Sequence, residues 1–492
     1  MMTLQTALSD ALSSLQAVEA QTNLISNNVA NASTPGYVDR TVLLQEQVEG
    51  GVGQGVASST VQRLADQSLA TAANQASGAA AYSGEMVNVL TPYVSNVGQA
   101  ADSNSLPSTI SAFQQALTAL SANPADSTTQ SAAVTAAQNV VDQFQTLSQS
   151  VSSAREQADQ GIATGVATVN STLDALAQNE AALKNAAANG QPTAPFQDQR
   201  DSLLATLSQQ VPIRVLDDGN GGIVVTTDGG TTLWDGAEHK LSFTATPSIT
   251  PQMTSANPPP AGYTTGLSQV TVDGAPIAMS QSGSIAADLQ LRDVTLPQFS
   301  SQLDQIAGNL ISTFQTADPS VTSGQTGLFT ADGAAVNMSN PTQIPGLAGE
   351  IALNASVDPS QGGQAWRMVS GAQATTQGQA SDNSTVLAFL NAMNATGSYT
   401  AATGFTGSMT VGSAASAASG AQQAALSDWT DRNTTRTQQS QDATTALSNQ
   451  TGVNVDEELQ RLLVVQQTQS ATAQVIEAVS SMMQTLVQMT LQ

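Results

Sequence analysis

The sequence of 492 residues contains no cysteine, which excludes disulfide bonds, zinc–thiolate sites and thiol nucleophiles. Positive charge is also scarce, since 12 Lys and Arg stand against 37 Asp and Glu, for a formal net charge of −25. Binding to nucleic-acid phosphates depends on neutralisation by basic side chains, and this chain has few of them. We therefore expect no cysteine redox chemistry and no nucleic-acid partner.

Long apolar runs are absent too. Residues 1–15 lack the basic region and the continuous apolar core of a cleaved signal peptide, because Ser9, Asp10, Ser13 and Ser14 interrupt every apolar run. No stretch of about 18 residues is apolar enough to cross a bilayer. We expect no membrane insertion and, if the protein leaves the cell, another export route.

Histidine is nearly absent, and this limits catalysis. The single histidine, His239, follows Glu238 without a nucleophile motif nearby, so a hydrolytic triad and a multi-histidine metal site are both excluded. We interpret His239 as an ordinary surface or strand residue.

Glycine-rich segments do not supply a ligand site either. Residues 51–55 have the wrong spacing for a phosphate-binding loop and predict a β-turn segment. The Asp-Gly clusters at 217–222 and 228–230 lack the final carboxylate of a calcium loop and are typical of turns. We expect no catalytic residue, no cofactor, no metal and no enzyme activity.

What the sequence does have is a heptad pattern near its start. No Gly or Pro interrupts the chain from Leu4 until Pro35, which predicts one long helix with a coiled-coil seam. The seam positions, which alternate at spacings of four and three, are Leu4, Leu8, Ala11, Leu15, Val18, Thr22, Ile25, Val29 and Ala32.

A second, looser seam occupies the end of the sequence. Gly452 predicts the end of one helix and Asn454 the cap of the next. The polar members Gln466 and Gln469 lie at the middle of this seam, so we expect the C-terminal helix to be the more adaptable partner, free to bond neighbouring subunits. Its positions are Val455, Leu459, Leu462, Gln466, Gln469, Ala473, Ile476, Ser480, Met483, Val487 and Thr490.

An apolar stripe at helical spacing usually packs inside the domain to which it belongs. Here, in contrast, we expect the two terminal segments to be only marginally stable as an isolated pair, and to become ordered when neighbouring subunits cover them.

Between the ends the pattern changes several times. Residues 107–209 show helical periodicity, broken at Asn123-Pro124 and around 190–195. From about Val211, short β-type runs separated by Asp-Gly turns predict hairpins. Helix returns over 296–314 and near Thr385, residues 319–378 are mixed, and a Gly-, Ser- and Ala-rich interval covers 403–420.

These patterns predict a multidomain α+β fold, in which both termini form a long α-helical rod or coiled coil and a β-rich domain is inserted. The expected domains are terminal coiled-coil segments at 1–40 and 453–492, a helical rod at 41–210, 293–318 and 379–452, and a β-rich outer domain at 211–292 and 319–378.

The segment after the first helix resembles a known signature. Residues 30–37 read Ala-Asn-Ala-Ser-Thr-Pro-Gly-Tyr and resemble the Ala-Asn-x-x-Thr-Pro-Gly-Tyr motif of flagellar rod, hook and hook-associated proteins. Pro35-Gly36 suits the centre of a type II turn, and Tyr37 can anchor that turn by its ring. The motif residues that we expect to matter for assembly are Asn31, Thr34, Pro35, Gly36 and Tyr37.

A second set of motifs resembles the hook-associated protein 1 family, also called FlgK. Asp198-Gln199-Arg200-Asp201-Ser202-Leu203-Leu204 resembles that family's Asp-Gln-Arg-Asp-x-Leu-Leu helix, which hook and rod proteins do not typically carry. Similar segments lie at 55–66, 113–126, 296–307 and 452–458.

The resemblance implies a structural adaptor at the bacterial hook–filament junction, which polymerises into a ring. It further implies type III export, an extracellular location on the flagellum, and contacts with hook protein, hook-associated protein 3 and a cytoplasmic export chaperone on the C-terminal segment. Two alternatives stay open: another flagellar axial protein, such as flagellin or hook protein, and a surface adhesin that binds through the β-rich domain.

Overall fold

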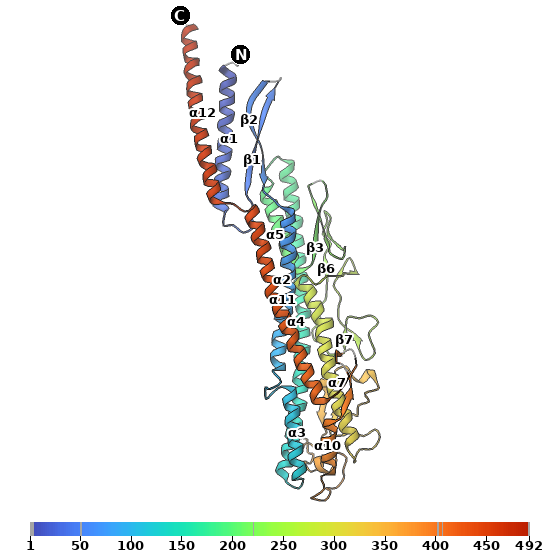
Figure 1. The fold of residues 1–492 in the computed structure, drawn as a ribbon. Coiled ribbons are helices and arrows are strands. Elements are labelled where there is room, and N and C mark those ends of the chain that lie inside the picture. The colour runs from blue at the N-terminus through green and yellow to red at the C-terminus, as the bar shows by residue number, and fades with distance from the viewer. Residues whose placement is uncertain (1–3, 50–51, 220, 401–402, 406, 491–492) are drawn as a thin grey trace.

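The molecule is elongated, with both termini at the same end (Figure 1). Its computed structural model describes residues 4–49, 52–219, 221–400, 403–405 and 407–490. A long bundle of helices carries small sheets along one side, and the two terminal helices extend beyond the bundle at one end. Among the helices of these described ranges, none is long and apolar enough to span a bilayer.

The long bundle contains most of the helical residues. Asp126 accepts a hydrogen bond from the backbone N–H of Thr128 and so caps the longest helix, just after the break predicted at Asn123-Pro124. That break and the one predicted around 190–195 are confirmed. The helices of the bundle are α2 (Gln67–Val97), α3 (Leu106–Ala122), α4 (Ser127–Ala188), α5 (Ala194–Gln210), α6 (Ser284–Gln290), α7 (Leu296–Ala317), α10 (Ser384–Asn394) and α11 (Val411–Thr451).

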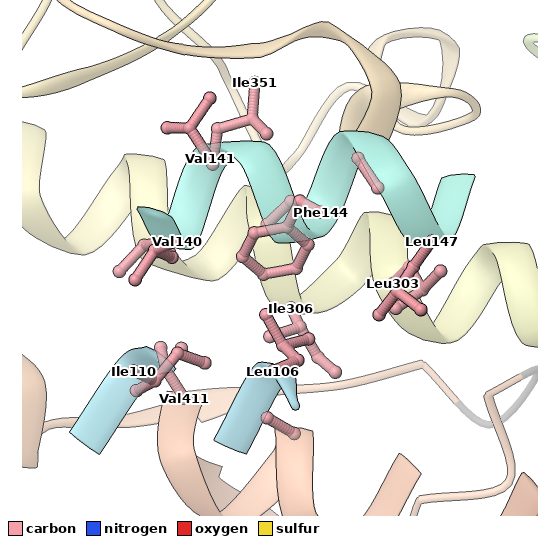
Figure 2. Packing of buried hydrophobic residues seen from close by; sticks show 14 of the residues in the cluster. Leu106, Ile110, Val140, Val141, Phe144, Leu147, Leu303, Ile306, Ile351 and Val411 are labelled. Carbon is pink, nitrogen blue, oxygen red and sulfur yellow. The ribbon is translucent and has the colours of Figure 1, made fainter. Parts of the chain in front are cut away.

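The main core lies where α3, α4, α7 and α11 meet. Figure 2 shows the ring of Phe144 on α4 next to Ile306 of α7, and both side chains are fully buried. Each such apolar side chain contributes about 1.5–3 kcal/mol of burial free energy. Other core members in this view are Leu106, Ile110, Val140, Val141, Leu147, Leu303, Ile351 and Val411.

Small sheets line one side of the bundle. The first is antiparallel, with strand order β3-β4-β5, as the hairpin turns predict. The strands are β3 (Ile213–Asp217), β4 (Ile223–Thr227), β5 (Thr232–Trp234), β6 (Leu241–Ser242), β7 (Met253–Thr254), β8 (Thr264–Thr265), β9 (Thr271–Val272), β10 (Ala275–Pro276), β11 (Phe329–Ala331), β12 (Ile351–Leu353), β13 (Thr396–Ser398) and β14 (Ser408–Thr410).

Short helical segments complete this side of the molecule. They are the π-helix η1 (Leu291–Thr295), the 3-10 helices η2 (Pro341–Gln343) and η3 (Pro359–Gln361), and the one-turn helices α8 (Leu347–Glu350) and α9 (Arg367–Ser370). None of the sheets in the described residues has more than three strands, so the fold is α+β with helix dominant.

Two buried arginines attach the outer segments to the bundle. Arg155 of α4 donates hydrogen bonds to the carbonyls of Thr250 (3.1 Å) and Met253 (2.7 Å). Arg292 forms an ion pair with Asp159 at 2.7 Å, and both side chains are fully buried. Burial lowers the pKa of Arg155 to about 10, so its guanidinium remains charged at neutral pH. Because a buried charge is stable only when it is paired, this network fixes the outer loops on α4.

The structure differs from the sequence-based expectation in three segments. Residues 284–290, expected within the β-rich outer domain, form helix α6 of the bundle. Residues 41–63, expected within the helical rod, form the hairpin of β1 (Arg40–Glu49) and β2 (Val52–Arg63), in keeping with their β-branched residues and glycines. The interval 403–420, expected to precede the helix, is helical from Val411, because Thr410 accepts the N–H of Ser413 and the Ala residues favour helix.

Candidate assembly surface at the paired termini

The two terminal helices, α1 (Leu4–Asn31) and α12 (Val455–Thr490), lie side by side (Figure 1). Val18 and Ile25 of α1 and Val465 of α12 form a small buried apolar cluster between them. Val29 and Leu462 pack at its edge. The pairing therefore rests on a short apolar contact that is far smaller than the core of the bundle.

The seam predicted for α1 faces inward along its length. Ala11, Val18 and Ile25 are buried, and none of the other six seam positions is exposed. Those half-buried positions are Leu4, Leu8, Leu15, Thr22, Val29 and Ala32. The sequence analysis did not identify Ala17 and Asn28, which are also buried.

The seam of α12 has a different phase from the predicted one. Val465, Thr472 and Val479 are buried, and Thr472 lies 3.4 Å from the hydroxyl of Ser14 on α1. Of the predicted positions, Leu462, Ile476 and Met483 are half-buried. The exposed ones are Val455, Leu459, Gln466, Gln469, Ala473, Ser480 and Val487.

This correction has a simple physical reason. Spacings of four and three can be placed on α12 in two phases that share Leu462, Gln469, Ile476 and Met483, and Gln469 alone of these four is exposed. The pattern counted from Val455 takes the phase that contains Gln466, whereas α1 selects the phase that contains the apolar Val465. The sequence of α12 alone does not decide between them.

The consequence is an apolar face on α12 that nothing in the described chain covers. Leu463 and Val464 are 67% and 63% exposed. A second exposed group follows on the last turns, and the polar stretch 466–474 separates the two. The exposed large apolar side chains of α12 are Val455, Leu459, Leu463, Val464, Val475, Met482, Leu486, Val487 and Met489. Faces of this kind are typical of interaction sites.

The β1–β2 hairpin packs along α1. The backbone N–H of Val56 donates to the Ser13 hydroxyl at 3.1 Å. Gly55 has a φ of +92°, and a Cβ atom there would lie 2.1 Å from that hydroxyl oxygen. Only glycine allows this close approach, so Gly55 sets the contact between the hairpin and α1.

The Thr-Pro-Gly-Tyr turn anchors the lower end of α1. Gly36 has a φ of +81°, and the N–H of Tyr37 donates to the carbonyl of Thr34, as a type II turn requires. The hydroxyl of Tyr37 donates to Asn28 Oδ1 at 2.9 Å, and its ring lies 4.4 Å from the guanidinium carbon of Arg40. Asn31 and Pro35 lie in the same turn region.

Asn28 also joins α1 to the chain that follows the turn. Its amide nitrogen donates to Asp39 Oδ1 at 2.7 Å and to the carbonyl of Arg40 at 2.9 Å. Arg461 of α12 reaches both Asp39 (3.3 Å) and Glu458 (2.6 Å). Burial, reinforced by the nearby Asp39 carboxylate, raises the pKa of Glu458. These polar groups hold the bases of α1 and α12 together.

The Asp-Gln-Arg-Asp-x-Leu-Leu motif lies on α5, beside the base of the hairpin. Asp198 accepts hydrogen bonds from Arg40 and from Arg63, and Arg63 also pairs with Asp201 at 2.7 Å. Arg200 lies 3.5 Å from Glu180. In the same motif Gln199 is exposed, Leu203 half-buried and Leu204 buried.

Ser13, Asn28, Arg40 and Arg461 were not identified from the sequence, and Arg63 was noted only as part of the segment 55–66. The partners of Asn28 lie within 12 positions, but Ser13, Arg40 and Arg63 have partners far along the chain, and one sequence carries no signal of such pairings. Elsewhere, the described residues contain no cluster of three or more acidic or histidine side chains that could hold a metal ion. His239 is paired with Asp273 at 2.7 Å, and this hydrogen bond raises its pKa.

Known proteins match both the bundle and the N-terminal helix. Residues 94–327 match the helical domain of flagellar hook-associated protein FlgK, and residues 3–37 match the flagella basal body rod protein family. A solved structure of the flagellar hook junction protein FlgK from Burkholderia pseudomallei is 20% identical, with a TM-score of 0.43 over 53% of this chain and 46% of that one.

Curated relatives called flagellar hook-associated protein 1 agree with the family match. The protein from Salmonella typhimurium is 27% identical over 61% of this chain and 54% of its own length, and that from Escherichia coli 25% over 63% and 56%. The Bacillus subtilis protein is 28% identical over 46% of each chain. The chain spans about half the length of the curated relatives it matches. By its helical domain, residues 94–327, and by these curated relatives, the chain is similar to the FlgK family of flagellar hook-associated proteins.

Proposed function

We propose that this protein is a structural adaptor at the junction of the bacterial flagellar hook and filament, where its copies polymerise into a ring. The observation that carries the proposal is the exposed apolar face of α12, which α1 leaves uncovered. Water in contact with such a face is unfavourable by about 25 cal/mol per Å², so a neighbouring subunit that covers it gains free energy. The terminal helices then act as the assembly surface.

The division of labour within the chain follows from this role. The assembly segments are 1–40 and 453–492, within which α1 and α12 form the terminal coiled coil. Of the segments expected in the rod, 41–210, 293–318 and 379–452, those that follow the β1–β2 hairpin space the assembly surface from the outer domain, whereas the hairpin itself lies with the terminal helices. That outer domain is the inserted β-rich part, 211–292 and 319–378.

The expected partners are further copies of the chain, hook protein on one side and hook-associated protein 3 on the other. A cytoplasmic export chaperone covers the C-terminal segment before type III export to the extracellular flagellum. The exposed apolar side chains of α12 support this step, because a free chain with this face uncovered is prone to self-association.

Two other functions compete with this one. Another axial role, such as that of flagellin or hook protein, shares the terminal helices but not the motif from Asp198 to Leu204. A surface adhesin would use the β-rich segments instead, and this role does not explain the exposed apolar face of α12. The helical-domain match over residues 94–327 favours the adaptor over both.

Deletion of residues 455–492 separates these functions. In cells that carry the truncated chain, the adaptor role predicts loss of filament attachment, with flagellin shed into the medium. Normal filaments together with lost adhesion would instead support the adhesin.

A finer test changes only the exposed face of α12. The double variant Leu463→Asp with Val464→Asp places two charges on that face and should prevent assembly. Gln467→Asp with Gln474→Asp adds the same charge at exposed polar positions of the same helix and is the matched control. Sedimentation of the purified proteins, together with motility, measures the result. Equal behaviour of the two double variants would contradict the assignment of the assembly face.

A further inference from the structure

The terminal part, by which we mean α1, α12 and the β1–β2 hairpin, meets the bundle at a narrow joint (Figure 1). The chain crosses this joint in two short connections, at 64–66 before α2 and at 452–454 between α11 and α12. Short connections of this kind fix the position of two bodies but allow rotation, because a few residues can absorb a large change in backbone angles. A further contact is needed to set the angle between the two bodies.

That contact lies at the base of the hairpin. Arg40 and Arg63 are directly opposite each other on β1 and β2, and both reach the same carboxylate, Asp198 of α5. Arg63 Nε donates to Asp198 Oδ1 at 2.7 Å, and its terminal nitrogen also pairs with Asp201 at 2.7 Å. The side chains of Arg40, Arg63 and Asp198 are only 13%, 9% and 12% exposed.

The geometry makes this contact directional. Guanidinium groups donate in a fixed planar fork, and charge-assisted hydrogen bonds are about twice as strong as neutral ones. Since Asp198 is held from both strands at once, the hairpin base cannot turn about α5 without breaking at least one of these bonds. The low exposure of the three side chains also limits screening by salt.

Neither body needs the contact for its own fold. The hairpin is held by its own strand pairing from Arg40↔Arg63 to Glu49↔Val52, and by its packing on α1. Helix α5 packs on the bundle through Leu204 and Leu207, on other turns of the helix from Asp198. The pairs to Asp198 therefore act between the two bodies rather than within either.

The contact is also linked to α1. Tyr37 stacks on the guanidinium of Arg40, and its hydroxyl donates to Asn28 of α1. A continuous set of contacts therefore runs from α5 through Asp198, Arg40 and Tyr37 to the helix that packs against α12.

We propose that Asp198, held by Arg40 and Arg63, is a positioning residue that fixes the angle at which the terminal helices leave the bundle. Its role is to orient an assembly surface to which it does not itself belong. In the ring, this angle determines whether the apolar face of α12 points at a neighbouring subunit. Only this last consequence rests on the proposed function.

The absence of cysteine makes the angle directly measurable. Gln474→Cys on α12 and Ala181→Cys on α4 are exposed positions that accept spin labels, one on each body. Double electron–electron resonance on the doubly labelled monomer then gives the distribution of distances between the two spin labels, and so between the two bodies. We expect one narrow distribution for the parent chain, and a broadened and shifted one after Asp198→Asn, with the thermal unfolding of the bundle unchanged.

Two further variants keep the test decisive. Asp201→Asn removes only the more exposed partner of Arg63, so it should broaden the distribution less than Asp198→Asn. If Asp198→Asn fails to fold, Arg40→Gln with Arg63→Gln removes the same contact from the hairpin side and should broaden the distribution in the same way. Distance distributions in the variants that match the parent, or a parent distribution already as broad as theirs, would overturn the proposal.

Assembly gives a separate readout. Asp198→Asn should reduce assembly while leaving the apolar face of α12 intact, whereas Leu463→Asp with Val464→Asp should prevent assembly without changing the measured distance. If the parent chain never assembles, yet shows a narrow distribution of label distances that broadens in Asp198→Asn, then the proposed ring is refuted and the positioning role of Asp198 stands.

Discussion

The bundle and the terminal helices are both built from long helices. The bundle buries most of its large apolar side chains, whereas α12 leaves most of its own exposed. In the bundle, Phe144 and Ile306 are fully buried in a core to which most of the bundle helices contribute. In α12, Val465 is buried while its neighbours Leu463 and Val464 are more than 60% exposed. The bundle is thus complete within one chain, whereas the terminal helices hold an apolar face that one chain leaves open.

The largest effect should come from a cavity in the bundle. Phe144→Ala removes a fully buried ring from the core, and we expect a loss of about 3–5 kcal/mol in the free energy of unfolding. Chemical denaturation followed by circular dichroism measures the loss. A change below about 1 kcal/mol would show that this core collapses around the gap and is not close-packed.

A buried carboxylate gives the bundle a pH dependence. Burial raises the pKa of Asp304 to about 7, although the N–H groups of Ala348 and Gly346 oppose the shift. In the unfolded chain this group titrates near 4, so the folded state binds more protons between about pH 4 and pH 7. Its contribution to stability is therefore complete below pH 4 and is lost as the pH rises towards 7.

Unfolding measured across this pH range tests the assignment. Asp304→Asn cannot titrate, so it should remove the contribution of this group to the pH dependence of the bundle's stability. Its single side-chain oxygen can accept only one of the two N–H groups that the two carboxylate oxygens accept, so we also expect a loss of stability that does not depend on pH. An unchanged slope in Asp304→Asn would show that this carboxyl does not titrate in the range.

A smaller effect distinguishes the two faces of α12. Val465→Ala shortens a buried side chain and should weaken the pairing of α1 with α12 by about 1–2 kcal/mol, at about 0.8 kcal/mol per buried methylene. Val464→Ala is the same change one residue earlier, at a side chain that is 63% exposed, and should cost less than about 0.5 kcal/mol. Amide hydrogen exchange along α1 measures both. Equal losses of protection would contradict the assignment of Val465, rather than Val464, to the face of α12 that packs on α1.

Features that depend on nearby residues could be predicted from the sequence, whereas features that depend on distant residues could not. Helix ends were predictable, because Asn123-Pro124, Gly452 and Asn454 act on their immediate neighbours. The Thr-Pro-Gly-Tyr turn was predictable for the same reason. Local chemistry is complete within a few residues, so one sequence is enough to recognise it.

The seam phase of α12 and the joint at Asp198 depend instead on residues far along the chain. Val465 is selected over Gln466 only by α1, more than four hundred positions earlier. Asp198 was marked by its motif, but its partners Arg40 and Arg63 are 158 and 135 positions away. Long-range pairing of this kind leaves no periodic signal, which is why the motif could be found without its role.

The smallest effect on the stability of the monomer should come from changes at Gln466 and Gln469, the polar members at the middle of the predicted seam of α12. Gln466 and Gln469 are exposed on α12, so replacing both with Leu should change the free energy of unfolding by less than about 0.5 kcal/mol. If these amides bond to neighbouring subunits, the double variant removes those hydrogen bonds and adds two apolar side chains to the surface of α12. Assembly should then lose its specificity and yield irregular aggregates, which electron microscopy distinguishes from ordered polymers. Ordered assembly at the parent's rate would show that the glutamines face solvent in the polymer as they do in the monomer.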